Sequence, residues 1–317
     1  MSKQDIVTKE YMQNKDVFAD VFNYWLYNGE CVIEPSQLHI LDTTAFSLPY
    51  GTDQAGNPVQ KYRDVFMALT AMEDEDAAYV LLGIENQTDV HYAMPVRNML
   101  YDALQYSMQV RKAAQSRRME KASDKNESNA EFLSGFHRGD RLLPVITLVV
   151  YFGAEPWDGP LSITEMLTVK RKELLEWVAD YRINLISPTA MTEEEIDKFR
   201  SSMREVMLYI KYSKDPDKLR TLLDKDERMK VLDWNVANVI NTVTNSKLKI
   251  KKKERRVNMC EAIEAMRRES REEGIKESTL MYIKKLMKSM NLDAVGAMDV
   301  LEIVEEERDY YLKQLEK

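Results

Sequence analysis

The chain has only two cysteines, three histidines and no long apolar run. Cys31 and Cys260 lie far apart in sequence, so the sequence suggests neither a disulfide framework nor a zinc cluster, and a reducing compartment fits. No apolar stretch approaches the roughly 18 residues that a membrane-spanning helix needs. The first twenty residues are polar and lack the basic-then-apolar plan of a secretory signal. We therefore expect a cytoplasmic protein that does not enter a membrane.

The chain also lacks an excess of positive charge, because 53 acidic residues outnumber 45 lysines and arginines and give a formal net charge of −8. This balance argues against a protein that coats nucleic acid nonspecifically, although local basic patches can still bind phosphates. With 44% apolar and 31% charged residues the composition is that of a folded protein. The length allows one large domain or two smaller ones. We predict two parts, residues 1–190 and a helical extension over residues 191–317.

Two short apolar segments predict an antiparallel hairpin. They are Tyr62–Leu69 and Tyr79–Glu85, and the acidic run Glu73–Asp76 separates them. A turn centred between Asp74 and Glu75 places Asp64 opposite Glu85, with Cβ atoms about 4.5–5.5 Å apart. Because side chains alternate along a strand, Gln87 projects to the same face as Glu85. Two carboxylates and an amide then converge on one patch.

Like charges directly opposite each other destabilise a sheet, so the pair Asp64 and Glu85 needs compensation. A divalent cation, Mg²⁺ or Mn²⁺, would supply it, because such ions bind one or two carboxylates together with water and phosphate oxygens. The alternative is a register shifted by one or two residues, which leaves both acids as solvated strand ends. Metal binding distinguishes the two.

Helical periodicity appears on both sides of this hairpin. Val7–Tyr27 predicts one amphipathic helix that carries Asp16 and Asp20 one turn apart on its surface. Met94–Val110 predicts a helix packed on the sheet. It continues into a basic cluster that either follows a DNA backbone or forms a solvated face. The cations of this cluster are Arg111, Lys112, Arg117 and Arg118.

The unbroken apolar run Leu143–Tyr151 predicts a strand buried on both faces in the centre of the sheet. Residues 247–256 hold seven basic residues and one acid. This run, with Lys251, Lys252 and Lys253 at its middle, is either a phosphate-binding arm or the charged face of a helix. The charged two-helix tail from Glu261 onwards predicts packing or self-association into a homo-oligomer.

These motifs resemble a known family. Asp64, the strand ending in Glu85-Asn86-Gln87, the opening segment Asp16–Tyr24 and the run Leu143–Gly153 are similar to the recombination-promoting nuclease / putative transposase family of the PD-(D/E)XK nuclease superfamily. The resemblance covers the first 190 residues well and the remainder loosely. It implies an α/β fold with a restriction-endonuclease-like core, a small mixed sheet flanked by helices, followed by a helical C-terminal extension.

The resemblance also implies a function: a Mg²⁺-dependent DNA endonuclease associated with recombination or mobile elements. In this interpretation Asp64 and Glu85 bind the metal, Gln87 positions the attacking water and Asp20 is an outer ligand. One departure matters, because Gln87 occupies the position where the superfamily has lysine, and an amide cannot supply a positive charge. An alternative is a catalytically inactive module for DNA binding or protein interaction. A third is a helical scaffold in which the carboxylates are incidental.

Overall fold

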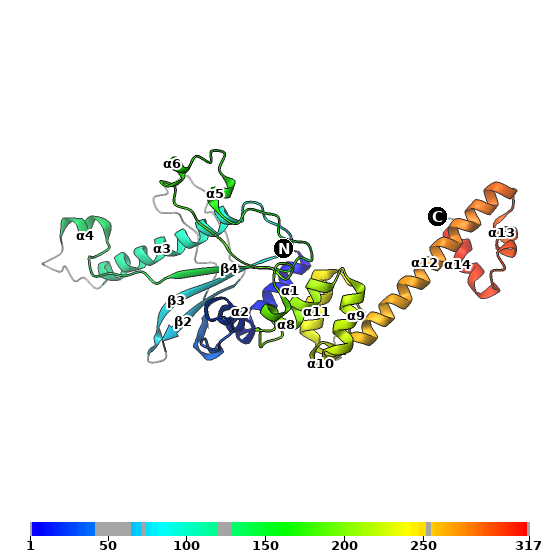
Figure 1. The fold of residues 1–317 in the computed structure, drawn as a ribbon, viewed down its shortest axis with the longest axis horizontal. Coiled ribbons are helices and arrows are strands. Elements are labelled where there is room, and N and C mark those ends of the chain that lie inside the picture. The colour runs from blue at the N-terminus through cyan, green and yellow to red at the C-terminus, as the bar shows by residue number, and fades with distance from the viewer. Residues whose placement is uncertain (1, 42–64, 72–73, 120–127, 252–254, 316–317) are drawn as a thin grey trace.

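A five-stranded mixed sheet with helices on both faces forms the body of the protein (Figure 1). The computed structural model describes residues 2–41, 65–71, 74–119, 128–251 and 255–315. The strands follow one another across the sheet in chain order; the first three are antiparallel and the last two continue parallel to the third. The predicted α/β class, with a mixed sheet flanked by helices, is confirmed. The strands are β1 (Leu38–Ile40), β2 (Val65–Ala71), β3 (Asp74–Gln87), β4 (Val145–Tyr151) and β5 (Asn184–Ile186).

The β2–β3 hairpin has the predicted register over most of its length. Val65 lies opposite Ile84, and the same pairing continues to Leu69 opposite Val80. Nearer the turn the register shifts between Leu69 and Ala71, and Ala71 lies opposite Asp74. The predicted turn between Asp74 and Glu75 is wrong, because β3 already begins at Asp74. The pairing that the sequence predicted is therefore confirmed for residues 65–69 and 80–84.

β4 is an interior strand, with β3 on one side and β5 on the other, and it runs parallel to both. The side chains of Leu148, Val149 and Val150 are fully buried. These consecutive residues point to alternate faces, so both faces are covered, as the continuous apolar run predicted.

One face of the sheet packs against four helices in a single large apolar cluster. They are α1 (Lys3–Met12), α2 (Lys15–Tyr27), α8 (Met203–Tyr212) and α11 (Trp234–Thr244). The prediction of one helix over Val7–Tyr27 is wrong, because the chain breaks between α1 and α2. Asn14 caps the second helix through its side-chain oxygen, which accepts a hydrogen bond from the Asp16 amide.

The other face is covered by α3 (Met94–Met119), which lies across the sheet on the side opposite α2 (Figure 1). Its apolar contacts with the sheet form two small clusters. Leu104 packs with Ala68 in one, and Met94 packs with Val149 and Ile183 in the other. Polar side chains fill the space between these clusters.

The large apolar cluster is not limited to the sheet and its nearest helices. It also contains buried side chains from the helical region after residue 190, as far as Ile263. A separate cluster around Ile283 joins the end of α12 to the last two helices, at the far end of the molecule (Figure 1). Within the described residues, no helix combines the length and apolarity needed to cross a bilayer. The remaining elements are the 3₁₀ turn η1 (Pro35–Gln37), α4 (Asn129–Ser134), α5 (Ile163–Met166), α6 (Lys172–Leu175), α7 (Glu193–Ile196), α9 (Pro216–Lys225), α10 (Glu227–Lys230), the strand pair β6 (Val231–Asp233) and β7 (Arg256–Asn258), α12 (Met259–Met290), α13 (Ala294–Val300) and α14 (Glu305–Leu315).

Candidate active site

Glu85 lies near the end of β3 on the face that α3 covers. Its neighbour Ile84 points into the large apolar cluster, so strand alternation directs Glu85 to the opposite side. The Glu85 side chain is fully buried. A buried carboxylate is costly unless it is paired, so its surroundings decide what it can do.

The partner of Glu85 is Arg97, in the first turns of α3. The distance from Arg97 Nη2 to Glu85 Oε2 is 3.1 Å, and the arginine side chain keeps some contact with solvent. Arg97 Nε also donates a hydrogen bond to the hydroxyl of Tyr101 one turn further on. The guanidinium therefore compensates the charge of Glu85 without a metal and holds a fixed positive charge beside it. Sequence reasoning missed Arg97.

Gln87, two residues after Glu85, is also buried and lies on the same face. Its amide nitrogen donates a hydrogen bond to the carbonyl oxygen of Asn86 at 2.8 Å. The amide oxygen is therefore the atom that Gln87 can present to a ligand or to water, as the predicted water-positioning role requires.

A cavity of about 280 Å³ opens beside these residues, beyond the carboxyl end of β3. In open α/β sheets this edge is where ligands bind. The cavity combines acidic, amide and basic side chains from α1, the end of β3, the β3–α3 connection and α3 itself. Its polar lining includes Asp5, Asn86, Gln87, Asp89, His91 and Arg97.

A band of polar side chains continues beneath α3. Asp102 accepts hydrogen bonds from the hydroxyls of Thr147 at 2.7 Å and Tyr181 at 2.6 Å. Asn98, one turn before Asp102, is fully buried, and neither atom of its amide has a hydrogen-bond partner in the part of the chain that the structure describes.

The position of Asn98 follows from its neighbours on α3. Met94, one turn earlier, packs on Val149, which pairs with Glu85 across the β3–β4 ladder. Asp102, one turn later, bonds Thr147, which pairs with Gly83. Asn98 therefore faces the part of the sheet that carries Glu85. A buried amide without partners costs about 1–3 kcal/mol, which marks it as a candidate site residue that the sequence did not reveal.

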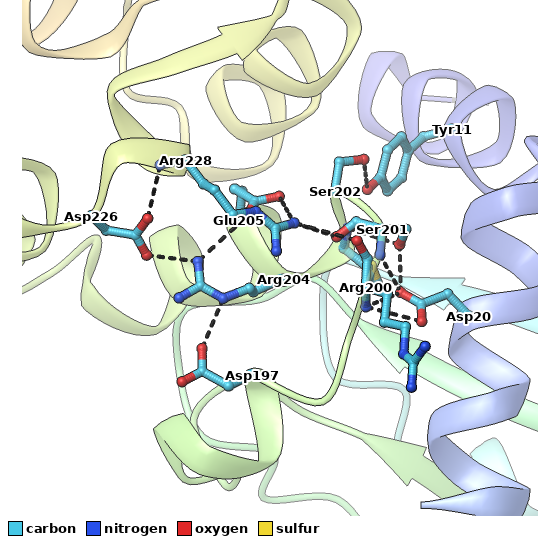
Figure 2. Close-up of polar contacts among 11 residues, drawn as sticks. Tyr11, Asp20, Asp197, Arg200, Ser201, Ser202, Arg204, Glu205, Asp226 and Arg228 are labelled. Carbon is cyan, nitrogen blue, oxygen red and sulfur yellow. Dashed lines mark hydrogen bonds and ion pairs between the residues drawn. The ribbon is translucent and has the colours of Figure 1, made fainter. Parts of the chain in front are cut away.

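Asp20 belongs to a different part of the molecule, on the α2 side of the sheet. Its carboxylate accepts hydrogen bonds from the backbone amides of Arg200 and Ser201 and, at 2.6 Å, from the Ser201 hydroxyl (Figure 2). These bonds hold the segment between α7 and α8. Asp20 therefore anchors this segment, and its expected role as an outer metal ligand stays a prediction.

A charged network lies next to Asp20 in the same view (Figure 2). The buried carboxylate of Glu205 pairs with Arg228 at 2.8 Å and with Arg204 at 3.4 Å. Burial raises the pKa of Glu205 although both arginines act to lower it. Arg204 also bonds Asp197 and Asp226, so the network ties α7, α8 and the end of α9 together. We regard it as structural.

Asp64 lies outside the described residues, immediately before β2. Among the residues that are described, no three histidine, cysteine or acidic side chains are grouped so that they could hold a metal ion. Glu85 and the oxygen of Gln87 are suitable ligands for Mg²⁺ or Mn²⁺ in kind, since both are hard oxygen donors. The predicted metal site therefore depends on Asp64 completing this set.

The basic residues predicted on α3 have different surroundings. Arg117 forms an ion pair with Asp140 and donates to the carbonyl oxygen of Gly135, and this contact lowers the pKa of Asp140 to about 2. Lys112 is exposed and Arg111 is half-buried. Arg118 lies in the same helix. Arg117 thus ties α3 to the loop before β4, which competes with the predicted role in binding DNA.

The second basic run does not form a helix in its described part, which contradicts one of the two readings of the sequence. Residues 247–251 form an irregular connection between α11 and β7, held by the side chain of Asn241, which bonds both the amide and the carbonyl of Leu248. Leu248 is buried in the large cluster and Lys251 is exposed. Lys252 and Lys253 lie outside the described residues.

A family model described as "Putative transposase, YhgA-like" matches residues 57–233. The match covers more than half of the chain and includes Glu85, Gln87, α3 and β4. No curated protein and no solved structure matches this chain.

Proposed function

Because this chain belongs to the YhgA-like putative transposase family, we propose that it acts on DNA in the service of mobile elements, as a metal-dependent endonuclease with a restriction-endonuclease-like core. The observation that carries the proposal is Glu85, a fully buried carboxylate at the end of an interior strand, paired with Arg97 beside a polar cavity. Buried charges at such an edge are seldom kept for stability alone.

Asp64, Glu85 and Gln87 are the proposed ligand set for Mg²⁺ or Mn²⁺. The β2–β3 register, continued by one residue from Val65 and Ile84, supports a pairing of Asp64 with Glu85. When bound, the ion would lower the pKa of a water molecule and neutralise charge on the phosphate. The oxygen of Gln87 would accept a hydrogen bond from that water and orient it towards the phosphorus.

Arg97 takes the role that the amide of Gln87 cannot fill. Its guanidinium remains protonated, is held by Glu85 and Tyr101, and lies at the same cavity as Gln87. A fixed donor at this place would stabilise the negative charge that develops on the phosphate during cleavage. We expect Arg97→Ala to reduce cleavage about 100-fold, as the loss of such a donor does in other hydrolases.

α3 offers a path for the DNA backbone away from the site. Arg111 and Lys112 lie on this helix about 21 Å from Arg97, by the rise of 1.5 Å per residue. Phosphates that leave the cavity along α3 would meet these cations next. The run around Lys251, together with Lys252 and Lys253, is a second candidate contact.

The test is cleavage of supercoiled plasmid with and without Mg²⁺. Asp64→Asn and Glu85→Gln should each abolish metal-dependent nicking. Asp16→Asn is the matched control, because Asp16 is an exposed acid on α2, on the opposite side of the sheet. Circular dichroism would verify that all variants fold. Full nicking by the purified Glu85→Gln variant would refute the site.

A catalytically inactive DNA-binding module is the second candidate. The observation that favours it is the Glu85–Arg97 pair, because the arginine already neutralises the carboxylate without an ion. Titration calorimetry with Mn²⁺ separates the two functions, since only the endonuclease needs an ion at Glu85.

Self-association through the C-terminal helices and a cytoplasmic location remain predictions. Comparing the sedimentation of the full chain with that of a variant that ends before Ile275 would test the self-association.

A further inference from the structure

A loop between β4 and β5 projects from the sheet on the side of α3 (Figure 1). Its stem is closed by two backbone hydrogen bonds, from the Ile163 amide to the Tyr181 carbonyl at 3.1 Å and from the Ile183 amide to the Leu161 carbonyl at 2.9 Å. Asp180 reinforces the stem by accepting bonds from the amide and the hydroxyl of Thr164. Residues 163–181 therefore form a closed surface loop of the kind that often carries function.

The stem is fixed to the helix that carries Arg97. The Tyr181 hydroxyl donates to Asp102 on α3 at 2.6 Å, and Leu161 and Tyr181 pack in the small cluster around Met94. Met94 begins α3 and lies one turn before Arg97. The loop is thus held rigidly at the end of α3 that borders the candidate active site.

The outer part of this loop exposes apolar side chains. Trp177 is 89% exposed, Leu174 53% and Val169 48%. Leu174 lies in the short helix α6, and Trp177 and the exposed Val178 follow directly after its end. A rigid loop that presents tryptophan to solvent keeps a large apolar surface unburied, which marks an interaction site.

Three consecutive cations, Lys170, Arg171 and Lys172, precede this apolar segment, and all three are exposed. None of them forms an ion pair with another residue in the described ranges. The acids Glu173 and Glu176 lie among them, so the surface is a local cationic edge and not a broad basic field. An exposed aromatic ring beside such an edge is the arrangement that proteins use to bind single-stranded nucleic acid, by stacking on a base and contacting phosphates.

We propose that the loop of residues 163–181 binds a DNA strand whose bases are unstacked, with Trp177 stacking on one base and Lys170, Arg171 and Lys172 contacting its phosphates. The inference rests on the proposed function and names the form of its substrate. A paired and stacked duplex offers no base face to Trp177, so the substrate would contain a single-stranded, frayed or bulged segment next to the bond at the Glu85 site.

Binding in the absence of metal tests the proposal separately from cleavage. Fluorescence anisotropy with a labelled single-stranded oligonucleotide in EDTA should give a Kd about tenfold weaker for Trp177→Ala, while Trp177→Phe retains most of the affinity. Binding of the blunt duplex of the same sequence should change less than about twofold. Trp25→Ala is the matched control, because Trp25 is also partly exposed but lies on α2, on the other face of the sheet.

The salt dependence of binding measures the contribution of the three cations separately. Replacing Lys170, Arg171 and Lys172 with glutamine should reduce the slope of log K against log salt by about two, since each phosphate contact on a single strand contributes about 0.7.

Unchanged single-strand affinity in Trp177→Ala would overturn the proposal, as would the absence of single-strand binding by the wild-type chain. Trp177-dependent binding to anionic phospholipid vesicles in place of the oligonucleotide would overturn it in favour of a membrane surface. Single-strand binding that depends on Trp177 in a protein without nicking activity would support this inference and refute only the endonuclease.

Discussion

The two faces of the sheet differ in what they bury. On the side of α1, α2 and α8 the buried side chains form one continuous apolar cluster that includes Leu82 and Ile84. On the side of α3 the apolar contacts are two small clusters, and a polar band with Glu85, Asn98 and Asp102 lies between them. Ile84 and Glu85 are adjacent in sequence, but Ile84 lies on the apolar face and Glu85 on the polar face. One face buries apolar side chains that supply stability, while the other accepts a cost in stability to bury polar and charged groups.

This contrast predicts that mutations one residue apart have opposite effects on stability and activity. A change on the apolar face should lower the free energy of unfolding while each folded molecule remains active. A change on the polar face should do the reverse. The following predictions test the contrast, from the largest expected effect to the smallest.

Leu82→Ala on the apolar face should lower the free energy of unfolding by about 2–5 kcal/mol, because it leaves a cavity among fully buried side chains. Urea unfolding followed by circular dichroism measures the change. Activity per folded molecule should be unaffected. A loss of less than 1 kcal/mol would mean that the apolar face is not the main source of stability.

Asp20→Asn should lower the free energy of unfolding by about 2–3 kcal/mol, since the charged acceptor of four hydrogen bonds is replaced by an amide. Mn²⁺ affinity, measured by calorimetry, should not change. Asp16→Asn on the same helix is exposed and should have little effect on either quantity. Normal stability with weakened Mn²⁺ binding would instead support Asp20 as an outer metal ligand.

Asn98→Leu should raise the free energy of unfolding by about 1 kcal/mol, because an apolar side chain of similar shape replaces a buried amide that lacks partners. Cleavage should fall by about tenfold or more if the amide orients groups at Glu85. Gln105→Met is the matched control, since Gln105 is buried two turns further along α3, with an amide nitrogen that has no partner in the described part of the chain. Equal activity of both variants would make Asn98 a packing residue only.

Asp140→Asn should cost less than about 1 kcal/mol at pH 7, because the ion pair with Arg117 is partly exposed. The pKa of Asp140 is lowered to about 2, chiefly by its hydrogen bond with Arg117. Its contribution is therefore present above the ordinary carboxyl pKa near 3.9 and is lost as the pH falls through about 2. Thermal unfolding of wild type and variant should converge at pH 2; a constant difference would show that the pair does not titrate.

Much of the contrast between the faces could be predicted from the sequence. The apolar segments 65–69 and 80–84, with a turn assumed between Asp74 and Glu75, gave the hairpin register, and the unbroken run in β4 gave an interior strand. Once a segment is a strand, the direction of its side chains alternates with a period of two, which is a local property of the chain. The directions of Ile84 and Glu85 followed from this period alone.

The partners of the polar groups could not be predicted in the same way. Arg97 reaches Glu85 only because α3 crosses the sheet at one particular place, and Asn98 is buried for the same reason. Asp20 has the sequence signature of a surface acid, yet it anchors a segment 180 residues away. Such contacts depend on how elements pack, and periodicity within one element carries no information about them.

α12 has a mechanical consequence for the whole chain. It is one uninterrupted helix whose Ile263 is buried in the body and whose Ile283 is buried in the C-terminal cluster. Twenty residues separate these points, about 30 Å of rigid rod at 1.5 Å per residue. The helix therefore fixes the orientation of the C-terminal cluster relative to the body. Inserting a single residue into its exposed middle would turn the C-terminal cluster by about 100° around the helix axis. Every residue added to or removed from this helix therefore changes both the distance between the two clusters and their relative rotation.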